Sequence, residues 1–311
     1  MIRAAVNRPP AWPLLGALLA LLALSLPLAS GLGAAPVAFS VSSNVLLHQL
    51  GLPVAPAWQP GQDLIIWQLR LPRVLLGGMV GAGLALVGAA LQATTRNQLA
   101  DPHLLGVSSG ATLGAVTVLL FSGNVLGGAT LPLAAFTGAL LATLLVTGIA
   151  VRQRRLQAER LLLAGVAVSF LLMALANLML YLGDHRSASA VLFWMLGGLG
   201  QARWELLPAP LAALCLGLVA LLAVARPSLL TGTMVAVSGA IGFVGLMIPH
   251  IARRCVGADH RRLLPACALL GALFLIWVDA AARTLIAPED IPVGVGTAAV
   301  GGAFFIWLLR R

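Results

Sequence analysis

The stretch Trp67–Gln92, WQLRLPRVLLGGMVGAGLALVGAALQ, decides the fold of this chain, because it contains one long apolar run. From Val74 to Leu91 no residue carries a charge. A helix needs about 20 apolar residues to cross the hydrocarbon core of a bilayer, so the stretch predicts a transmembrane helix. Two arginines, Arg70 and Arg73, stand at its beginning on either side of Pro72, where a charge is costly unless it has a role.

The composition of the whole chain agrees with a membrane protein. Of its 311 residues, 60% are hydrophobic and 9% are charged, which is more apolar surface than one soluble core can bury. The net charge of +10 comes from arginines alone, since the chain has no lysine. In a polytopic membrane protein such a surplus belongs to cytoplasmic loops, so nucleic acid is not an expected partner. The three cysteines show no metal or redox spacing.

Apolar windows long enough to cross the bilayer recur along the chain. They fall at about 11–31, 73–95, 103–121, 129–151, 161–182, 205–225, 263–283 and 291–309. The first window follows Arg3 and Arg8, so it reads either as a retained span, which we favour, or as a cleaved signal peptide. Gly77 and Gly81 form a small-x-x-x-small pair that predicts close helix packing.

Basic clusters assign the two sides of the membrane. They lie at the N-terminus, at Arg152–Arg160, at Arg253–Arg262 and at the C-terminus, and the positive-inside rule places all of them, with both termini, in the cytoplasm. Counting spans from there puts five arginines on the outer side, namely Arg70, Arg73, Arg186, Arg203 and Arg283. These arginines therefore run against the rule.

The stretch 228–252 fits the count poorly. Agreement with the basic clusters requires it to cross the membrane twice or not at all, and two crossings need about 40 residues, which is more than the stretch contains. The chain looks short at this point.

Several catalytic motifs are absent from the sequence. Without lysine the chain cannot form the G-x-x-x-x-G-K-[ST] phosphate loop, and it has neither an H-E-x-x-H nor a C-x-x-C-H motif. We therefore expect neither an enzyme nor a metal site. Asp279 is the one clear ionisable residue within an apolar window, and Arg283 follows it by one helical turn, so we predict an ion pair near the outer surface. If the chain moves a solute, the energy comes from another polypeptide.

Four segments, in the same order as in a known family, carry a resemblance. They are Leu69–Ala115 (LRLPRVLLGGMVGAGLALVGAALQATTRNQLADPHLLGVSSGATLGA), Val191–Leu199 (VLFWMLGGL), Ser238–Pro265 (SGAIGFVGLMIPHIARRCVGADHRRLLP) and Asp290–Arg311 (DIPVGVGTAAVGGAFFIWLLRR). They resemble the permeases of bacterial ABC importers for iron complexes and vitamin B12.

The resemblance implies an all-α, type II ABC importer permease of the bacterial inner membrane, with residues 1–311 as one transmembrane domain of about ten helices. It also implies a second copy of the chain, two cytoplasmic ATPase subunits that bind ATP and magnesium, and a periplasmic binding protein. No cofactor is expected in this subunit. In the family, outer arginines dock acidic residues of the binding protein, and these map onto Arg70, Arg73 and Arg283. A proline at the first helical turn is well placed there, so Pro72 predicts the helix start.

The resemblance also assigns residues on the cytoplasmic side. Asn97 and Leu99 correspond to residues that close the inner mouth of the pathway, although Gln98 replaces the usual proline of that turn. A second set belongs to a motif near the cytoplasmic surface for which an ATPase-facing role is implied. It comprises Pro249, His250, Arg253 and Arg254.

The chain departs from the family near residues 226–230, where family members carry the helices that grip the ATPase. The short span count points to the same place, so we infer a missing segment there, either omitted from the sequence or truly deleted.

For the substrate we favour an iron complex, haem or a ferric siderophore, over vitamin B12 (cobalamin). An ion-coupled secondary transporter is the hypothesis from another class, which the nearly charge-free membrane core disfavours.

Overall fold

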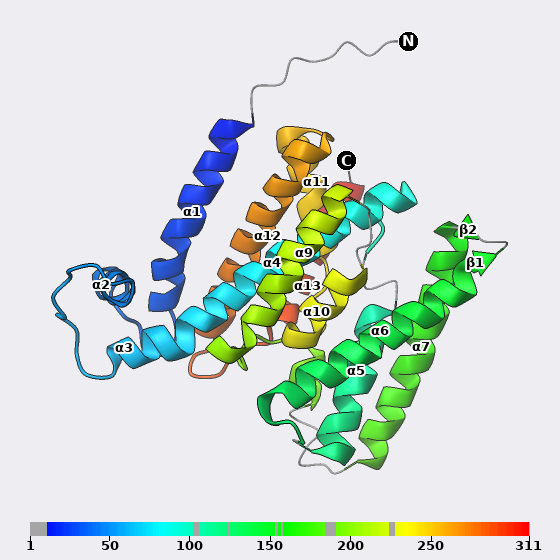
Figure 1. The fold of residues 1–311 in the computed structure, drawn as a ribbon, viewed down its shortest axis with the longest axis horizontal. Coiled ribbons are helices and arrows are strands. Elements are labelled where there is room, and N and C mark those ends of the chain that lie inside the picture. The colour runs from blue at the N-terminus through cyan, green and yellow to red at the C-terminus, as the bar shows by residue number, and fades with distance from the viewer. Residues whose placement is uncertain are drawn as a thin grey trace, which may run out of the picture.

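Helices form most of the chain that the computed structural model describes, which is residues 11–101, 106–123, 125–152, 155–156, 158–183, 191–223 and 228–310 (Figure 1). The strands among these residues are two short ones, β1 (Val151–Arg152) and β2 (Arg155–Leu156), which pair as an antiparallel hairpin. The all-α prediction is thus confirmed. In chain order the helices are α1 (Trp12–Gly31), α2 (Phe39–Gln49), α3 (Gln62–Leu64), η1 (Ile65–Arg70), α4 (Leu71–Thr95), α5 (Val107–Thr117), η3 (Val118–Ser122), η4 (Gly127–Ala129), α6 (Thr130–Ala150), α7 (Ala158–Leu182), η5 (Trp204–Leu206), α9 (Pro208–Ala223), α10 (Ser228–Ser238), α11 (Val244–Val256), α12 (His260–Thr284) and α13 (Val293–Leu309).

Helix α4 is the centre of the larger group of helices, with α9, α10, α11 and α12 packed around it. Two glycines permit close approach: a Cβ atom at Gly81 would lie 2.1 Å from the carbonyl oxygen of Gly271 in α12, and one at Gly88 would lie 1.9 Å from that of Gly245 in α11. Small residues let helix backbones pack this closely. The predicted packing role is therefore confirmed for Gly81, whereas Gly77 faces a side chain, that of Leu199.

The helix that contains α4 begins before Pro72, so the prediction that this proline marks the helix start is wrong. Residues 62–95 form one continuous helix, and η1 is a π-turn directly ahead of the proline. The N–H of Leu71 donates to the carbonyl of Ile66, five residues back. A proline inside an α-helix lacks one N–H donor and crowds the carbonyl four residues earlier, and the wider π geometry relieves that conflict.

A second group consists of α5, α6 and α7, which lie together to one side of the α4 group (Figure 1). Here too a glycine allows close contact, because a Cβ atom at Gly110 of α5 would lie 2.4 Å from the carbonyl oxygen of Gly138 in α6. Helix α10 contacts both α6 and α4 and thereby joins the two groups.

The outer helices expose their apolar side chains. In the most apolar windows of α1, α6 and α7 only 28% of residues are buried, against 83% in the helix containing α4. Leu163, Phe170 and Leu141 are each more than 60% exposed. A surface of this kind requires a lipid environment, in agreement with the predicted polytopic membrane protein.

The predicted spans correspond to helices in the structure. Five helices of the described chain are long and apolar enough to cross a membrane, and three shorter apolar helices, 107–121, 204–218 and 293–308, match the other windows. The stretch 228–252 is covered mostly by two short helices, α10 and α11, of 11 and 13 residues, the second of which continues to Val256. Neither reaches the length of a full span, so the shortage seen in the sequence recurs here, and the count of ten spans stays a prediction.

Candidate functional site

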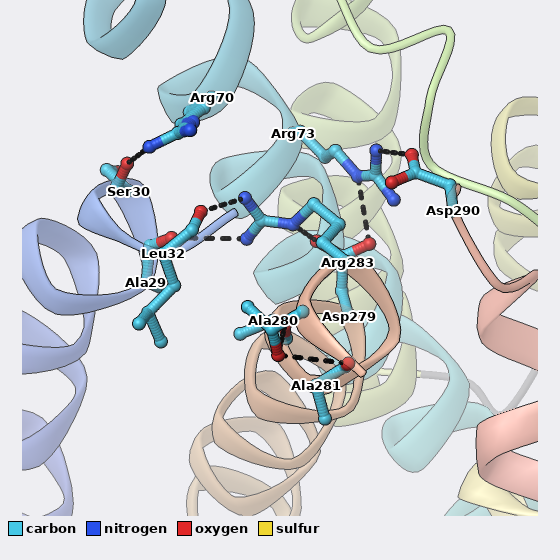
Figure 2. Close-up of polar contacts among 11 residues, drawn as sticks. Ala29, Ser30, Leu32, Arg70, Arg73, Asp279, Ala280, Ala281, Arg283 and Asp290 are labelled. Atoms are coloured by element: carbon cyan, nitrogen blue, oxygen red, sulfur yellow. Dashed lines mark hydrogen bonds and ion pairs between the residues drawn. The ribbon is translucent and has the colours of Figure 1, made fainter. Parts of the chain in front are cut away.

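Asp279 lies at the centre of a charged cluster that joins α4 to α12 (Figure 2). Its side chain is 1% exposed. Its Oδ1 accepts a hydrogen bond from Nε of Arg73 at 2.9 Å, and its Oδ2 accepts one from Nε of Arg283 at 3.0 Å. A buried carboxylate is costly unless it is paired, and here each oxygen has its own guanidinium. The predicted ion pair of Asp279 with Arg283 is thus confirmed, and Arg73 is a partner that the sequence did not reveal.

The C-terminal end of α1 completes the cluster. Arg283 donates from Nη1 to the carbonyl of Leu32 at 3.0 Å and from Nη2 to that of Ala29 at 3.2 Å. The last carbonyls of a helix have no partner within it and form the negative end of its dipole, so they suit guanidinium groups. Arg70 is half-buried and binds the same region, through the carbonyls of Ser30, Gly31 and Ala35.

A second acid reaches the cluster from the loop between α12 and α13. Nη1 of Arg73 donates to Oδ2 of Asp290 (Figure 2). The Asp290 side chain is 38% exposed, whereas that of Arg73 is 11% exposed. The charged cluster therefore opens to the surroundings at Asp290.

The structure thus brings together the three arginines predicted to dock a partner, although they come from distant parts of the sequence. Each of them is engaged within the chain, and the side chain of Arg283 is only 5% exposed. Three guanidinium groups and two carboxylates leave an excess of one positive charge. The three arginines predicted to dock a partner thus form a paired network with an exposed edge at Asp290.

The predicted gate residues lie in the turn after the far end of α4. Arg96 ends the helix in the left-handed region, with φ of 52°, and the side-chain oxygen of Asn97 accepts a hydrogen bond from the N–H of Leu99 at 2.9 Å. The side chain of Leu99 is 60% exposed. The turn is therefore locally fixed by Asn97, with an apolar side chain projecting from it.

The residues predicted to face the ATPase belong to α11, and α4 positions them. Buried Gln92 of α4 accepts a hydrogen bond from Arg253 and donates to the carbonyl of Gly245 at 3.1 Å. The ring of His250 packs edge-on against Phe304 of α13, with centroids 5.8 Å apart. The two remaining predicted residues differ in environment: Pro249 is buried within α11, and Arg254 is exposed, with its guanidinium 5.9 Å from the ring centroid of Trp307.

The two predicted sets lie at opposite ends of α4. Arg73 marks one end with its contact to α12, and Gln92 marks the other with its contact to α11. At a rise of about 1.5 Å per residue, the helix from Gln62 to Thr95 is about 50 Å long, which exceeds the hydrocarbon core of about 30 Å. One helix thus spans the distance between the arginine cluster and the gate turn.

Parts of several predictions lie outside the described residues. They include the N-terminal basic cluster, part of the cluster at 152–160, the outward-facing Arg186, and residues 226 and 227 of the inferred missing segment.

A helical bundle whose outer helices expose apolar side chains is typical of a membrane-spanning protein. The model of the FecCD transport family matches residues 17–227 and 219–311. This chain belongs to the FecCD transport family of ABC importer permeases.

Relatives and a solved structure agree with this family. The chain is 41% identical over 277 residues to the vitamin B12 import system permease protein BtuC of Salmonella paratyphi A, covering 80% of this chain and 84% of that one. The same values hold for BtuC of Salmonella typhimurium. A solved structure described as a metal-chelate type ABC transporter in an inward-facing conformation aligns with a TM-score of 0.80 at 29% identity, covering 96% of this chain and 99% of that chain.

Proposed function

We propose that this chain is the membrane-spanning subunit of a vitamin B12 importer. The observation that carries the proposal is the 41% identity to vitamin B12 permeases over 80% of the chain. From the sequence we favoured an iron complex, with vitamin B12 as the alternative, and the relatives support vitamin B12 better. An iron complex is the second candidate, because the solved relative is described as a metal-chelate type transporter.

Uptake into proteoliposomes tests the substrate. The permease is reconstituted with its ATPase subunits and its binding protein, and ATP-driven uptake of labelled cyanocobalamin is compared with that of haem and of a ferric siderophore. We expect cyanocobalamin alone to accumulate. Accumulation of an iron complex instead would transfer the assignment to the second candidate, and transport without any ATPase would contradict the importer class.

The proposed assembly contains two copies of the chain, two ATPase subunits and a periplasmic binding protein. The arginine cluster at the start of α4 is proposed to lie on the outer side and to receive acidic residues of the binding protein, because arginine matches a carboxylate with two parallel hydrogen bonds. Asn97 and Leu99, at the far end of α4, are proposed as part of the cytoplasmic gate. Both termini then lie in the cytoplasm.

The docking role is best tested at Arg73. Changing Arg283 to an acid would place two carboxylates one turn apart in a buried site, so a loss of docking there would be ambiguous. Arg73→Gln leaves Asp279 paired with Arg283. We expect it to weaken binding of the binding protein at least tenfold, while Arg203→Gln, which removes an exposed arginine outside the cluster, leaves binding unchanged. Equal affinity of the two variants would refute the docking assignment.

The cytoplasmic contact is proposed to include the exposed end of α11, with Arg254 in reach of an ATPase and Arg253 held by Gln92. A segment missing near residues 226–230 fits this proposal, since the family model matches in two stretches that overlap at 219–227. Sequencing the gene across this region tests it: an uninterrupted reading frame without additional residues would establish a true deletion. ATPase activity that still couples to uptake would then show that α11 suffices for contact.

A further inference from the structure

Arg73 holds two acids that differ in burial, and this difference carries an inference about docking. Asp279 binds Nε of Arg73 from the interior, with 1% of its side chain exposed, and is shared with Arg283. Asp290 binds Nη1, with 38% of its side chain exposed. Separating the buried acid would leave uncompensated charges in the interior. The exposed acid forms a weak pair and regains water when it leaves.

We propose that Asp290 is a built-in competitor for the carboxylate that docks on Arg73. The inference rests on the proposed docking role of Arg73 and adds a device to it. While no binding protein is docked, Asp290 occupies the outer edge of the guanidinium. On docking, a carboxylate of the binding protein binds this edge of the guanidinium in place of Asp290, and the Asp290 side chain rotates toward the solvent.

The surroundings of Asp290 permit this exchange. Residues 285–290 of the loop between α12 and α13 are all exposed. The loop is anchored behind the acid, where the N–H of Ile291 donates to the carbonyl of Ala282 at 3.2 Å. Asp290 can therefore change its side-chain direction without moving α13.

Asp279 makes the exchange specific by keeping Arg73 in place. Because Asp279 holds Nε, the guanidinium plane stays fixed when Asp290 departs, and the Nη edge stays turned toward the loop. A guanidinium held in one orientation loses less conformational entropy on binding a carboxylate than a mobile one. The carboxylate of the binding protein then replaces that of Asp290 at Nη1 of Arg73.

The test measures affinity in the complete importer. The permease with its ATPase subunits is placed in nanodiscs, and the dissociation constant for the substrate-binding protein of the same system is measured for the wild type and for Asp290→Asn. Because an exposed ion pair has a modest strength, we expect Asp290→Asn to bind about three- to fivefold more tightly. Asp290→Ala is the second variant, because the asparagine side chain of Asp290→Asn can still accept a hydrogen bond from Arg73, whereas alanine cannot.

Glu289→Gln is the matched control. It removes the same charge from the neighbouring position, and no ion pair involving Glu289 is found among the described residues. We expect a change of less than twofold for it, which separates loss of the competitor from a general gain in positive charge. In the Arg73→Gln background, Asp290→Asn should have no effect, because the contested site is gone.

The outcomes separate this inference from the proposal beneath it. Tighter binding of Asp290→Asn that disappears with Arg73→Gln supports the competitor. If Arg73→Gln weakens docking but Asp290→Asn and Asp290→Ala match Glu289→Gln, or bind more weakly than the wild type, the competitor is refuted and the docking role stands. If Arg73→Gln leaves docking unchanged, both are refuted.

Discussion

The two ends of α4 are held by different chemistry. At one end, buried Asp279 is shared by Arg73 and Arg283, and an exposed acid completes the group. At the other end, the neutral amide of Gln92 accepts from Arg253 and donates to backbone carbonyls of α11. Both ends join α4 to a neighbouring helix through an arginine, which binds the carboxylate of Asp279 at the first end and the neutral amide of Gln92 at the second.

The difference suggests distinct roles for the two ends. A charged group with an exposed member can exchange one carboxylate for another, whereas an amide bound to backbone carbonyls fixes a helix in one place. Interactions between full charges are stronger and cost more to break when buried. The comparison predicts that, at the charged end, substitution of buried Asp279 destabilises the fold most and substitution of exposed Asp290 destabilises it least.

Asp279→Asn should have the largest effect. It leaves buried Arg283 without a carboxylate and Arg73 with the exposed Asp290 as its remaining acid, and breaking a buried ion pair costs about 3–5 kcal/mol. We expect the melting temperature of the detergent-solubilised permease to fall by several degrees, measured by thermal shift, with Glu289→Gln as the control. A melting temperature equal to that of the control would mean that the charged end does not stabilise the fold.

Gln92→Leu should have an intermediate effect. It removes a buried acceptor of a hydrogen bond from a charged group, which contributes about 1.5–3 kcal/mol, so the permease should melt below the wild type and above Asp279→Asn. Gln92→Glu sharpens the comparison, because it converts this end into an ion pair with Arg253 and should recover part of the loss. If Gln92→Leu and Asp279→Asn had the same melting temperature, the two ends would stabilise the fold equally and the comparison would be mistaken.

Asp290→Asn should have the smallest effect on stability. An exposed ion pair contributes at most about 1 kcal/mol, so its melting curve should nearly overlay that of the wild type. High salt should narrow the remaining difference, since it screens exposed charges. A fall in melting temperature as large as that of Asp279→Asn would show that Asp290 is needed for the stability of the fold.

Local patterns in the sequence predicted the features that depend on short segments. Apolar runs located the helices, and the four-residue spacing from Asp279 to Arg283 gave their ion pair, because residues one helical turn apart face each other. The family resemblance identified the class of transporter. The break within 228–252 was also visible, as a stretch too short for two spans.

Contacts between distant segments were not predictable in this way. Arg73 and Asp279 are 206 positions apart, and nothing in either segment indicates that they meet. Nothing in the sequence indicated that the carbonyls of α1 bind Arg283 or that Asp290 binds Arg73. The position of Pro72 was misread because a π-turn leaves no recognisable pattern in a single sequence.

The π-turn η1 also explains why two arginines only three positions apart serve different neighbours. In a regular α-helix, residues at this spacing lie on one face, yet Arg70 turns to α1 and Arg73 to α12. A π-turn accommodates one extra residue and so rotates the residues before it about the helix axis relative to those after it. Removing a single residue from Ile65–Arg70 would therefore reassign the partner of every side chain upstream of Pro72 while leaving the composition of the helix almost unchanged.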